Sequence, residues 1–272
     1  MFPKLISIGG FYLPTYGVLV ALGFLAGLAM ATRLGVRAGL DKEKLTNLGV
    51  YCVLAGLLGA KLSMIAFDWQ QYASRPTELL SLETLQSAGV FQGGVVLAFA
   101  VGVWYMRREK LPVLRTLDVF APGLALGHAI GRLGCFAAGC CWGARCDRAW
   151  AVEFTSVDAA RLTGVPLGTA LHPTQLYDAF AEVVIFGLLY RLAMRGPAAG
   201  TIMGLYLVLY STARFFIEFY RAHMQELPFG LPLSLTQWIA ISMAIGGLYL
   251  LRASIRRTTP DGQHSAVPGI SV

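Results

Sequence analysis

The chain has 272 residues, of which 56% are hydrophobic and only 14% are charged. A soluble domain usually carries about 25% charged residues, so the composition excludes one large soluble core and favours a membrane protein. The formal net charge of +7 does not indicate nucleic-acid binding, because the basic residues are spread over several connections instead of forming one patch.

Long apolar blocks recur along the whole chain. Each is near the ~20 residues that a helix needs to cross a bilayer, and helices satisfy every backbone group in lipid without closing a barrel. The first block is too long for the apolar region of a cleavable signal peptide. We therefore expect an all-α integral membrane protein with seven transmembrane helices. The expected spans are residues 14–34, 46–66, 89–107, 117–139, 173–194, 200–221 and 235–254.

The distribution of lysine and arginine predicts the orientation. The odd-numbered connections and the C-terminal tail hold 13 of these residues, whereas the N-terminus and the even-numbered connections hold 6. Since cytoplasmic loops carry the excess of positive charge, we expect the N-terminus outside and the C-terminus in the cytoplasm.

The longest connection is expected on the outer side, over residues 140–172. It could form a small extracytoplasmic head between the fourth and fifth helices, with strand character in residues 149–156 and a short helix after them. We assign residues 1–254, head included, to one membrane domain. Residues 255–272 are expected to form a flexible cytoplasmic tail.

Two arginines lie within the expected spans. Arg132 is near the outer end of the fourth span, and Arg214 lies in the sixth with Glu218 four residues later. An ionisable residue at membrane depth costs about 2.5–3.5 kcal/mol, so such residues usually face the interior and mark a site. Two alternatives are a simple helix-stabilising Arg214–Glu218 pair and arginines that extend to the interface. Two guanidinium groups from different helices suit a phosphate, such as a phospholipid head group.

Polar stretches open three other spans. They are FQGG at 91–94, HPTQLYDAF at 172–180 and TQW at 236–238. Each alone is typical of helix capping, but all three are expected on the outer side, together with GRLGCFAAGCCWG at 131–143. Their convergence indicates a site open to the outer leaflet.

The cysteines divide into one isolated residue and one cluster. Cys52 lies in an apolar span and is expected to pack as a small apolar side chain. Cys135, Cys140, Cys141 and Cys146 fall within twelve residues on the oxidising side, which favours a disulfide of undetermined pairing. The C-x4-C-C-x4-C spacing is not a usual zinc pattern, nor is it the C-x-x-C of redox thiols. A structural disulfide is therefore favoured, with metal or redox chemistry as the alternative.

Several motifs together resemble one enzyme family. GRLGCFAAGCCWG is similar to G-R-x-G-N-F-x-N-x-E-x-x-G, the signature of prolipoprotein diacylglyceryl transferases. HPTQLY at 172–177 resembles the family's H-P-S-Q-L-Y, and RFFIEF at 214–219 resembles R-F-x-x-E-F. Tyr16-Gly17 looks like the Tyr-Gly of the family's first span, and the match covers residues 11 to 254.

The resemblance implies an enzymatic activity that needs no metal or cofactor, and it implies a cellular location. The family transfers the diacylglyceryl group of phosphatidylglycerol to the lipobox cysteine of preprolipoproteins, forms a thioether and releases glycerol phosphate, which is a step in lipoprotein biogenesis. Its implied partners are phosphatidylglycerol, preprolipoproteins and membrane lipid. It implies a multi-pass protein of the bacterial cytoplasmic (inner) membrane with the active site toward the outer leaflet.

The resemblance also implies roles for individual residues. Arg132 and Arg214 would hold the phosphate and stabilise the charge that grows on the leaving group, and Glu218 would orient Arg214. His128, one turn before Arg132, is a candidate base or a hydrogen-bonded core histidine. The residues expected to bind substrate are Tyr16, Gln92, Gly93, Gly94, Cys135, Gly143, His172, Gln175, Tyr177 and Gln237.

Three departures of this sequence from the family pattern concern the chemistry of the site. Gln92 stands where the family has a histidine often suggested as the general base, and glutamine cannot take a proton at neutral pH. Cys135 and Cys140 replace the signature asparagine and glutamate. A different acceptor is therefore an alternative, as are a transporter or flippase for an anionic lipid or metabolite and a membrane thiol-redox protein. Acyl-chain preference and oligomeric state are open from the sequence.

Overall fold

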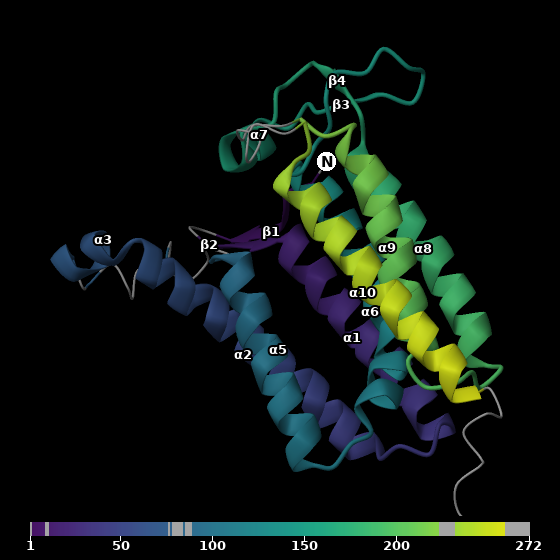
Figure 1. Ribbon diagram of the computed structural model, residues 1–272. Coiled ribbons are helices and arrows are strands. Elements are labelled where there is room, and N and C mark those ends of the chain that lie inside the picture. Colours follow the sequence, from purple (N-terminus) through teal and green to yellow (C-terminus); the bar gives the residue numbers. More distant parts are fainter. Residues whose placement is uncertain are drawn as a thin grey trace, which may run out of the picture. The chain divides into compact units, whose positions relative to one another are not determined.

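The computed structural model describes residues 2–8, 11–75, 77, 84, 89–222 and 232–258. Its contacts group the chain into two compact units, one of Met1–Leu34 with Leu117–Val272 and the other of Gly35–Thr116. Figure 1 shows that helices dominate the described residues. The expected tail falls partly outside them, since only the part up to Thr258 belongs to a described helix.

Long helices lie at each range where the sequence predicts a span. Those with 18 or more residues in the described chain are α1 (Thr15–Arg37), α2 (Lys42–Phe67), α5 (Phe91–Arg108), α6 (Val113–Ala138), α8 (Thr174–Ala193), α9 (Thr201–Glu218) and α10 (Leu235–Thr258). Four of them, α1, α2, α6 and α10, are long and apolar enough to cross a membrane. Helices α8 and α9 carry the charged residues described below.

In the first unit, α1 and α6 cross backbone against backbone. A Cβ atom on Gly23 would lie 2.7 Å from the carbonyl oxygen of Gly127, and one on Gly27 would lie 2.5 Å from that of Gly123. Each helix thus presents two glycines four residues apart, the arrangement that lets membrane helices approach closely.

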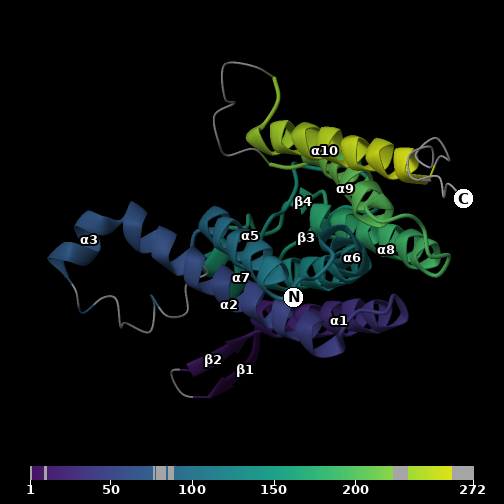
Figure 2. The same ribbon diagram turned by 60° about the horizontal axis from the view of Figure 1, so that its bottom comes forward.

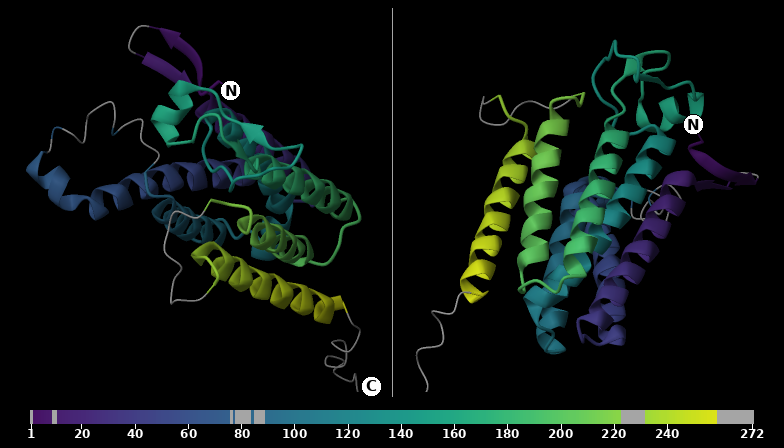
Figure 3. Two further views of the ribbon diagram at one scale, coloured as in Figure 1. Left: turned by 90° about the horizontal axis from the view of Figure 1, so that it is seen from above. Right: turned by 90° about the vertical axis from the view of Figure 1, so that its right-hand side faces the viewer.

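Helices α6, α8, α9 and α10 belong to the same unit and lie side by side (Figures 1 and 3). Their apolar core includes Ala125 of α6, Leu189 of α8 and Tyr206 of α9. The buried carboxylate of Asp118 on α6 accepts hydrogen bonds from the backbone N–H groups of Gly200 at 2.6 Å and Met203 at 2.8 Å. Because Gly200 has no side chain to cap α9, Asp118 satisfies N–H groups that the helix leaves open.

A small head follows α6 at one end of this bundle (Figure 3, right). It contains β3 (Val152–Glu153), α7 (Val157–Thr163) and β4 (Ala170–Leu171), with β3 and β4 paired antiparallel. Phe154 is fully buried there among Ala159, Val165 and Leu171. The expected strand and short helix are therefore confirmed. A hairpin of β1 (Lys4–Ile8) and β2 (Phe11–Pro14) precedes α1.

The second unit contains α2, the short α3 (Trp69–Ser74) and α5 (Figure 2). Glycines again mark the contact of its two long helices, because a Cβ on Gly59 would lie 2.5 Å from the carbonyl oxygen of Gly93 and one on Gly94 would lie 2.7 Å from that of Gly56. The half-buried thiol of Cys52 lies 3.7 Å from the carbonyl oxygen of Ala98. It fills a space between α2 and α5, as expected.

We predict that Gly123→Ala lowers the free energy of unfolding by about 1–3 kcal/mol, because the added methyl group would overlap the backbone of α1. Thermal unfolding in detergent measures this effect. Gly131→Ala on the same helix is the matched control, since a Cβ there meets nothing within 4 Å. Equal midpoints for the two variants would contradict the proposed crossing.

Candidate functional site

The signature segment, residues 131–143, comprises the last two turns of α6 and the turn that follows the helix. The N–H of Gly139 donates to the carbonyl of Phe136 at 3.2 Å, and the N–H of Cys140 donates to that of Cys135 at 3.1 Å. With a φ of +76° at Gly139, these two bonds form a Schellman motif. The motif ends the helix and turns the chain back, so that Cys140 and Cys141 lie beside Cys135.

Three thiols meet at this turn. The Sγ atoms of Cys135, Cys140 and Cys141 all lie within 4.8 Å of one another. Cys141 has a φ of +62°, a left-handed conformation that costs a residue with a Cβ atom about 1 kcal/mol or more. Cys135 is buried, and the other two are half-buried.

The fourth cysteine of this part of the sequence, Cys146, lies apart from the other three. Cys146 is buried in the head, where its N–H donates to the carbonyl of Ala170 at 3.0 Å. All five cysteines are free thiols in the structure, so the disulfide favoured by the sequence is not formed there. The turn after α6 brings three of the thiols together and leaves Cys146 among the residues of the head.

The surroundings shift the pKa values of the Cys140 and Cys141 thiols in opposite directions. Hydrogen bonds from Cys135 and Cys140 lower the pKa of the Cys141 thiol, and the positive charges of Arg221 and Arg132 lower it further. Its bonds to Cys135 and Cys141 raise the pKa of the Cys140 thiol, as does burial.

Residues of the HPTQLY stretch hold this segment in place. The Thr174 hydroxyl donates to the carbonyl of Cys141 at 2.9 Å, and the Gln175 amide donates to that of Cys140 at 2.6 Å. Both side chains are almost fully buried at the start of α8. Gln175, expected to bind substrate, thus fixes the backbone of the thiol segment.

Gly143 lies where three backbone segments meet. A Cβ atom there would lie 2.5 Å from the carbonyl oxygen of Tyr220 and 2.7 Å from that of His172. The N–H of Gly143 donates to His172, and the N–H of Ala144 donates to Tyr220 at 2.8 Å. This close packing at Gly143 joins the signature segment to the start of α8 and the end of α9.

Aromatic side chains cover this junction. The Tyr177 hydroxyl lies 3.0 Å from Nδ1 of His172 and accepts a hydrogen bond from the Trp150 indole at 2.8 Å. The rings of His172 and Tyr220 are in contact, with centroids 5.1 Å apart. His172 and Tyr177, both predicted to bind substrate, lie in one aromatic cluster beside Gly143.

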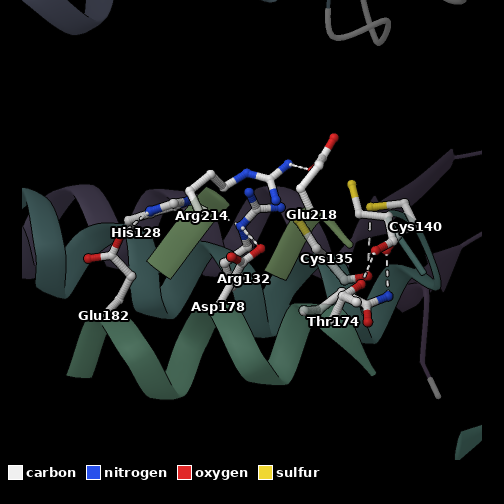
Figure 4. Close-up of polar contacts among 11 residues, drawn as sticks. His128, Arg132, Cys135, Cys140, Thr174, Asp178, Glu182, Arg214 and Glu218 are labelled. Carbon is white, nitrogen blue, oxygen red and sulfur yellow. Dashed lines mark hydrogen bonds and ion pairs between the residues drawn. The ribbon is translucent and has the colours of Figure 1, made fainter. Parts of the chain in front are cut away.

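A buried network connects α6 and α8 (Figure 4). The Nε–H of Arg132 is shared between Nε2 of His128 at 3.1 Å and the carboxylate of Asp178 at 3.2 Å. Nδ1 of His128 lies 2.7 Å from the carboxylate of Glu182. Since Arg132 can only donate, Nε2 of His128 accepts, and Nδ1 carries the proton that Glu182 receives as a hydrogen bond. Both nitrogens of this candidate base are therefore occupied.

A second ion pair lies on α9. Arg214 Nη2 is 2.6 Å from Glu218 Oε2, and both residues are buried. The Ser234 hydroxyl also donates to Glu218, at 3.1 Å. Arg214 Nη1 is buried and has no hydrogen-bond partner among the described residues. The predicted orientation of Arg214 by Glu218 agrees with this geometry.

Gln237, predicted to bind substrate, forms hydrogen bonds at the start of α10. Its Oε1 accepts from the N–H of Ser234 at 2.9 Å, and its own N–H donates to the Ser234 hydroxyl at 3.2 Å. These reciprocal bonds form a capping box at the start of α10. Gln237 is almost fully buried, so it supports Ser234, which in turn contacts Glu218.

The two arginines approach the same region from different helices. Figure 4 shows both guanidinium groups between His128 and Glu218. The Tyr210 hydroxyl on α9 lies within electrostatic range of both. Arg132 in turn lies within electrostatic range of Cys135 and Cys141. The convergence of arginines predicted from the sequence thus occurs within one unit, next to the thiol cluster.

Tyr16 and the FQGG residues lie outside this network. Tyr16 starts α1, packs near Gly134 and lies within electrostatic range of the three clustered cysteines. Gln92, Gly93 and Gly94 open α5 in the other unit. The close approach that the two glycines permit is made by α2, and a substrate role for Gln92, Gly93 and Gly94 stays a prediction.

Sequence reasoning missed the partners of Arg132. His128 and Arg132 are four residues apart on α6, and so are Asp178 and Glu182 on α8. In the structure they pair in antiparallel order, Arg132 with Asp178 and His128 with Glu182. Two polar pairs with the same helical spacing in two apolar helices were the available signal.

Comparisons with known proteins agree with the motifs. A family model described as prolipoprotein diacylglyceryl transferase matches residues 3–253. The phosphatidylglycerol–prolipoprotein diacylglyceryl transferase of Synechococcus elongatus is 31% identical over 275 residues, covering 99% of this chain and 93% of that protein. The enzyme of the same name from Methylobacillus flagellatus is 32% identical over 264 residues, covering 94% of this chain and 97% of that protein.

We predict that Asp178→Asn lowers the free energy of unfolding by about 3 kcal/mol, because it leaves the buried charge of Arg132 without its carboxylate. Thermal or denaturant unfolding in detergent measures the loss. Asp178→Glu keeps the charge and should restore most of the stability. Wild-type stability of Asp178→Asn would show that the ion pair contributes nothing.

Proposed function

Because the chain belongs to the prolipoprotein diacylglyceryl transferase family, we propose that it transfers the diacylglyceryl group of phosphatidylglycerol to the lipobox cysteine of preprolipoproteins. The observation that carries this proposal is the approach of Arg132 and Arg214 to one buried region. Each guanidinium group has a carboxylate partner, and Arg214 Nη1 still lacks an acceptor among the described residues. A phosphate oxygen would supply it.

We further propose the membrane arrangement. Seven helices span the bacterial cytoplasmic membrane, with the N-terminus outside, the C-terminus in the cytoplasm and the active site at the outer leaflet. The bias of lysine and arginine toward one set of connections supports this orientation. Polar residues such as Asp178, Glu218 and Gln237 gather where their helices meet the signature segment, as an outer-leaflet site requires.

The reaction balances without a redox step. The sulfur of the acceptor cysteine forms a bond to the terminal glyceryl carbon, and the bond from that carbon to the phosphate oxygen breaks. Glycerol phosphate leaves with the electron pair of the broken bond, and the thiol proton passes to solvent or to the leaving phosphate. Arg132 and Arg214 stabilise the added negative charge, which donors positioned in advance do most effectively in a water-poor site.

His128 acts as a positioning residue in this proposal. Its Nε2 already accepts a hydrogen bond from Arg132, and its Nδ1–H is directed to Glu182. It could take the acceptor's proton only by breaking the bond that fixes Arg132. We therefore assign it to the orientation of Arg132 in place of the base role considered from the sequence.

We predict that Arg214→Lys lowers kcat/KM by about 100-fold or more, because lysine cannot reproduce the two-pronged contact with phosphate. Mass spectrometry of a lipobox peptide incubated with phosphatidylglycerol vesicles measures the thioether product. Arg195→Lys, at an exposed position after α8, is the matched control and should retain wild-type activity. Vectorial lipid movement without covalent product in the wild type would favour the transporter alternative.

We predict that His128→Gln retains most activity, since a glutamine can donate to Glu182 and accept from Arg132, whereas His128→Leu loses most of it. The profile of kcat/KM against pH should be the same for wild type and His128→Gln. Loss of a titrating step in the Gln variant, together with a large fall in kcat, would instead identify His128 as the base.

A further inference from the structure

The thiol cluster has the dimensions of a metal site. A tetrahedral zinc ion with bonds of about 2.3 Å to sulfur holds its ligands about 3.8 Å apart, and the Sγ atoms of Cys135, Cys140 and Cys141 lie within 4.8 Å of one another. A small inward rotation of the side chains would close the remaining difference. Among the described residues, no other group of three potential His, Cys, Asp or Glu ligands comes as close together.

The backbone around the cluster is held in position from several sides. The Schellman bond from Cys140 to Cys135 fixes one pair of ligands. The buried side chains of Thr174 and Gln175 fix the carbonyls of Cys141 and Cys140. Such support outside the ligands is characteristic of metal sites, because it orients the ligands before the metal binds. The left-handed backbone of Cys141 is a local cost that a ligand position would explain.

The cluster also offers three protein ligands and leaves a fourth position open. Three protein ligands with one open position are typical of catalytic zinc, whereas structural zinc is held by four. The fourth cysteine, Cys146, lies outside the cluster. The half-buried state of Cys140 and Cys141 leaves a side from which another ligand can approach.

We propose that Cys135, Cys140 and Cys141 bind one zinc ion as thiolates and that its open position receives the thiol of the acceptor cysteine. The role of the bound acceptor rests on the transferase activity proposed above. Three soft sulfur ligands select a thiophilic ion, and zinc is one that does not change its oxidation state. This proposal departs from the expectation of no metal that the family resemblance implied.

Zinc would supply what the residue replacements removed. A thiol that coordinates zinc is deprotonated outright, so the acceptor would lose its proton to solvent on binding and need no histidine at position 92. The coordinated sulfur then attacks the terminal glyceryl carbon, and glycerol phosphate leaves. The thioether product is a much weaker zinc ligand than the thiolate and dissociates. Cys135 lies three residues after Arg132, so the sulfur and the phosphate would be about one helical turn apart.

The first experiment measures metal content. The full-length protein is purified in detergent with a reductant, exposed to zinc, desalted and analysed by elemental mass spectrometry. We expect about one zinc per wild-type chain and less than a tenth of that in Cys135→Ser, Cys140→Ser and Cys141→Ser. Cys52→Ser and Cys146→Ser are matched controls that should keep the zinc. Zinc should also raise the unfolding temperature of the wild type but not that of the triple serine variant, which separates lost ligands from lost folding.

The second experiment tests the open position without relying on turnover. Cobalt replaces zinc, and the thiolate-to-cobalt absorption is recorded as a lipobox peptide is added. We expect the band to grow with the cysteine peptide and to stay unchanged with the same peptide carrying serine. An unchanged spectrum with both peptides would overturn the proposed binding of the acceptor thiol.

Measurements of transfer activity then distinguish the zinc proposal from the proposed transferase function. Removal of zinc by a chelator should lower the transfer rate by 100-fold or more, and added zinc should restore it. Full transfer by the metal-free enzyme would overturn the zinc proposal and leave the transferase function standing. Zinc binding with no transfer by any form would contradict the transferase function instead. Failure to bind zinc, binding of copper in its place, or a disulfide among the three cysteines in isolated membranes would overturn the metal site.

Discussion

Charges buried in an apolar helical bundle must find partners, and this constraint determines how α6 and α8 fit together. Arg132 needs Asp178, and Arg214 needs Glu218. An unpaired charge in such surroundings costs several kcal/mol. The carboxylate partner of Arg132, Asp178, comes from α8. The ion pair between them therefore fixes the register of two antiparallel helices while it orients the guanidinium group.

The signature segment depends on the same arrangement. Gly143 can lie against the carbonyls of His172 and Tyr220 only because it has no side chain. Those two contacts join the ends of α8 and α9 to the segment that follows α6. As a result the arginines and the cysteines belong to one site, although they lie up to 82 residues apart in the sequence between Arg132 and Arg214.

The replacements in this chain form a consistent chemical pattern. The family's histidine is glutamine at position 92, and two further signature positions carry sulfur at Cys135 and Cys140. Loss of a proton acceptor and gain of thiol ligands make sense together if activation of the acceptor passes from a base to a metal ion. His128 does not fill the gap, because its two nitrogens already hold Arg132 and Glu182 in place.

The sequence by itself determined the helical membrane class, the family and the two arginines of the site. These conclusions depend on local properties, because each rests on a contiguous stretch of sequence. The stretches are the apolar blocks of span length and the motifs GRLGCFAAGCCWG and RFFIEF. It also placed Glu218 beside Arg214, because a spacing of four residues on a helix needs no tertiary information.

Only the tertiary structure decided which polar residues meet. The pairing of Arg132 with Asp178 and of His128 with Glu182 depends on the register between two helices, which no contiguous pattern encodes. Gln175 and Gln237 also hydrogen-bond backbone groups, which the sequence did not indicate, because buried backbone groups require partners wherever the fold places them. The cysteine spacing matched no usual zinc pattern, yet the turn at Gly139 reverses the chain and gathers three thiols within 4.8 Å, because side-chain proximity depends on backbone direction and not on distance along the sequence.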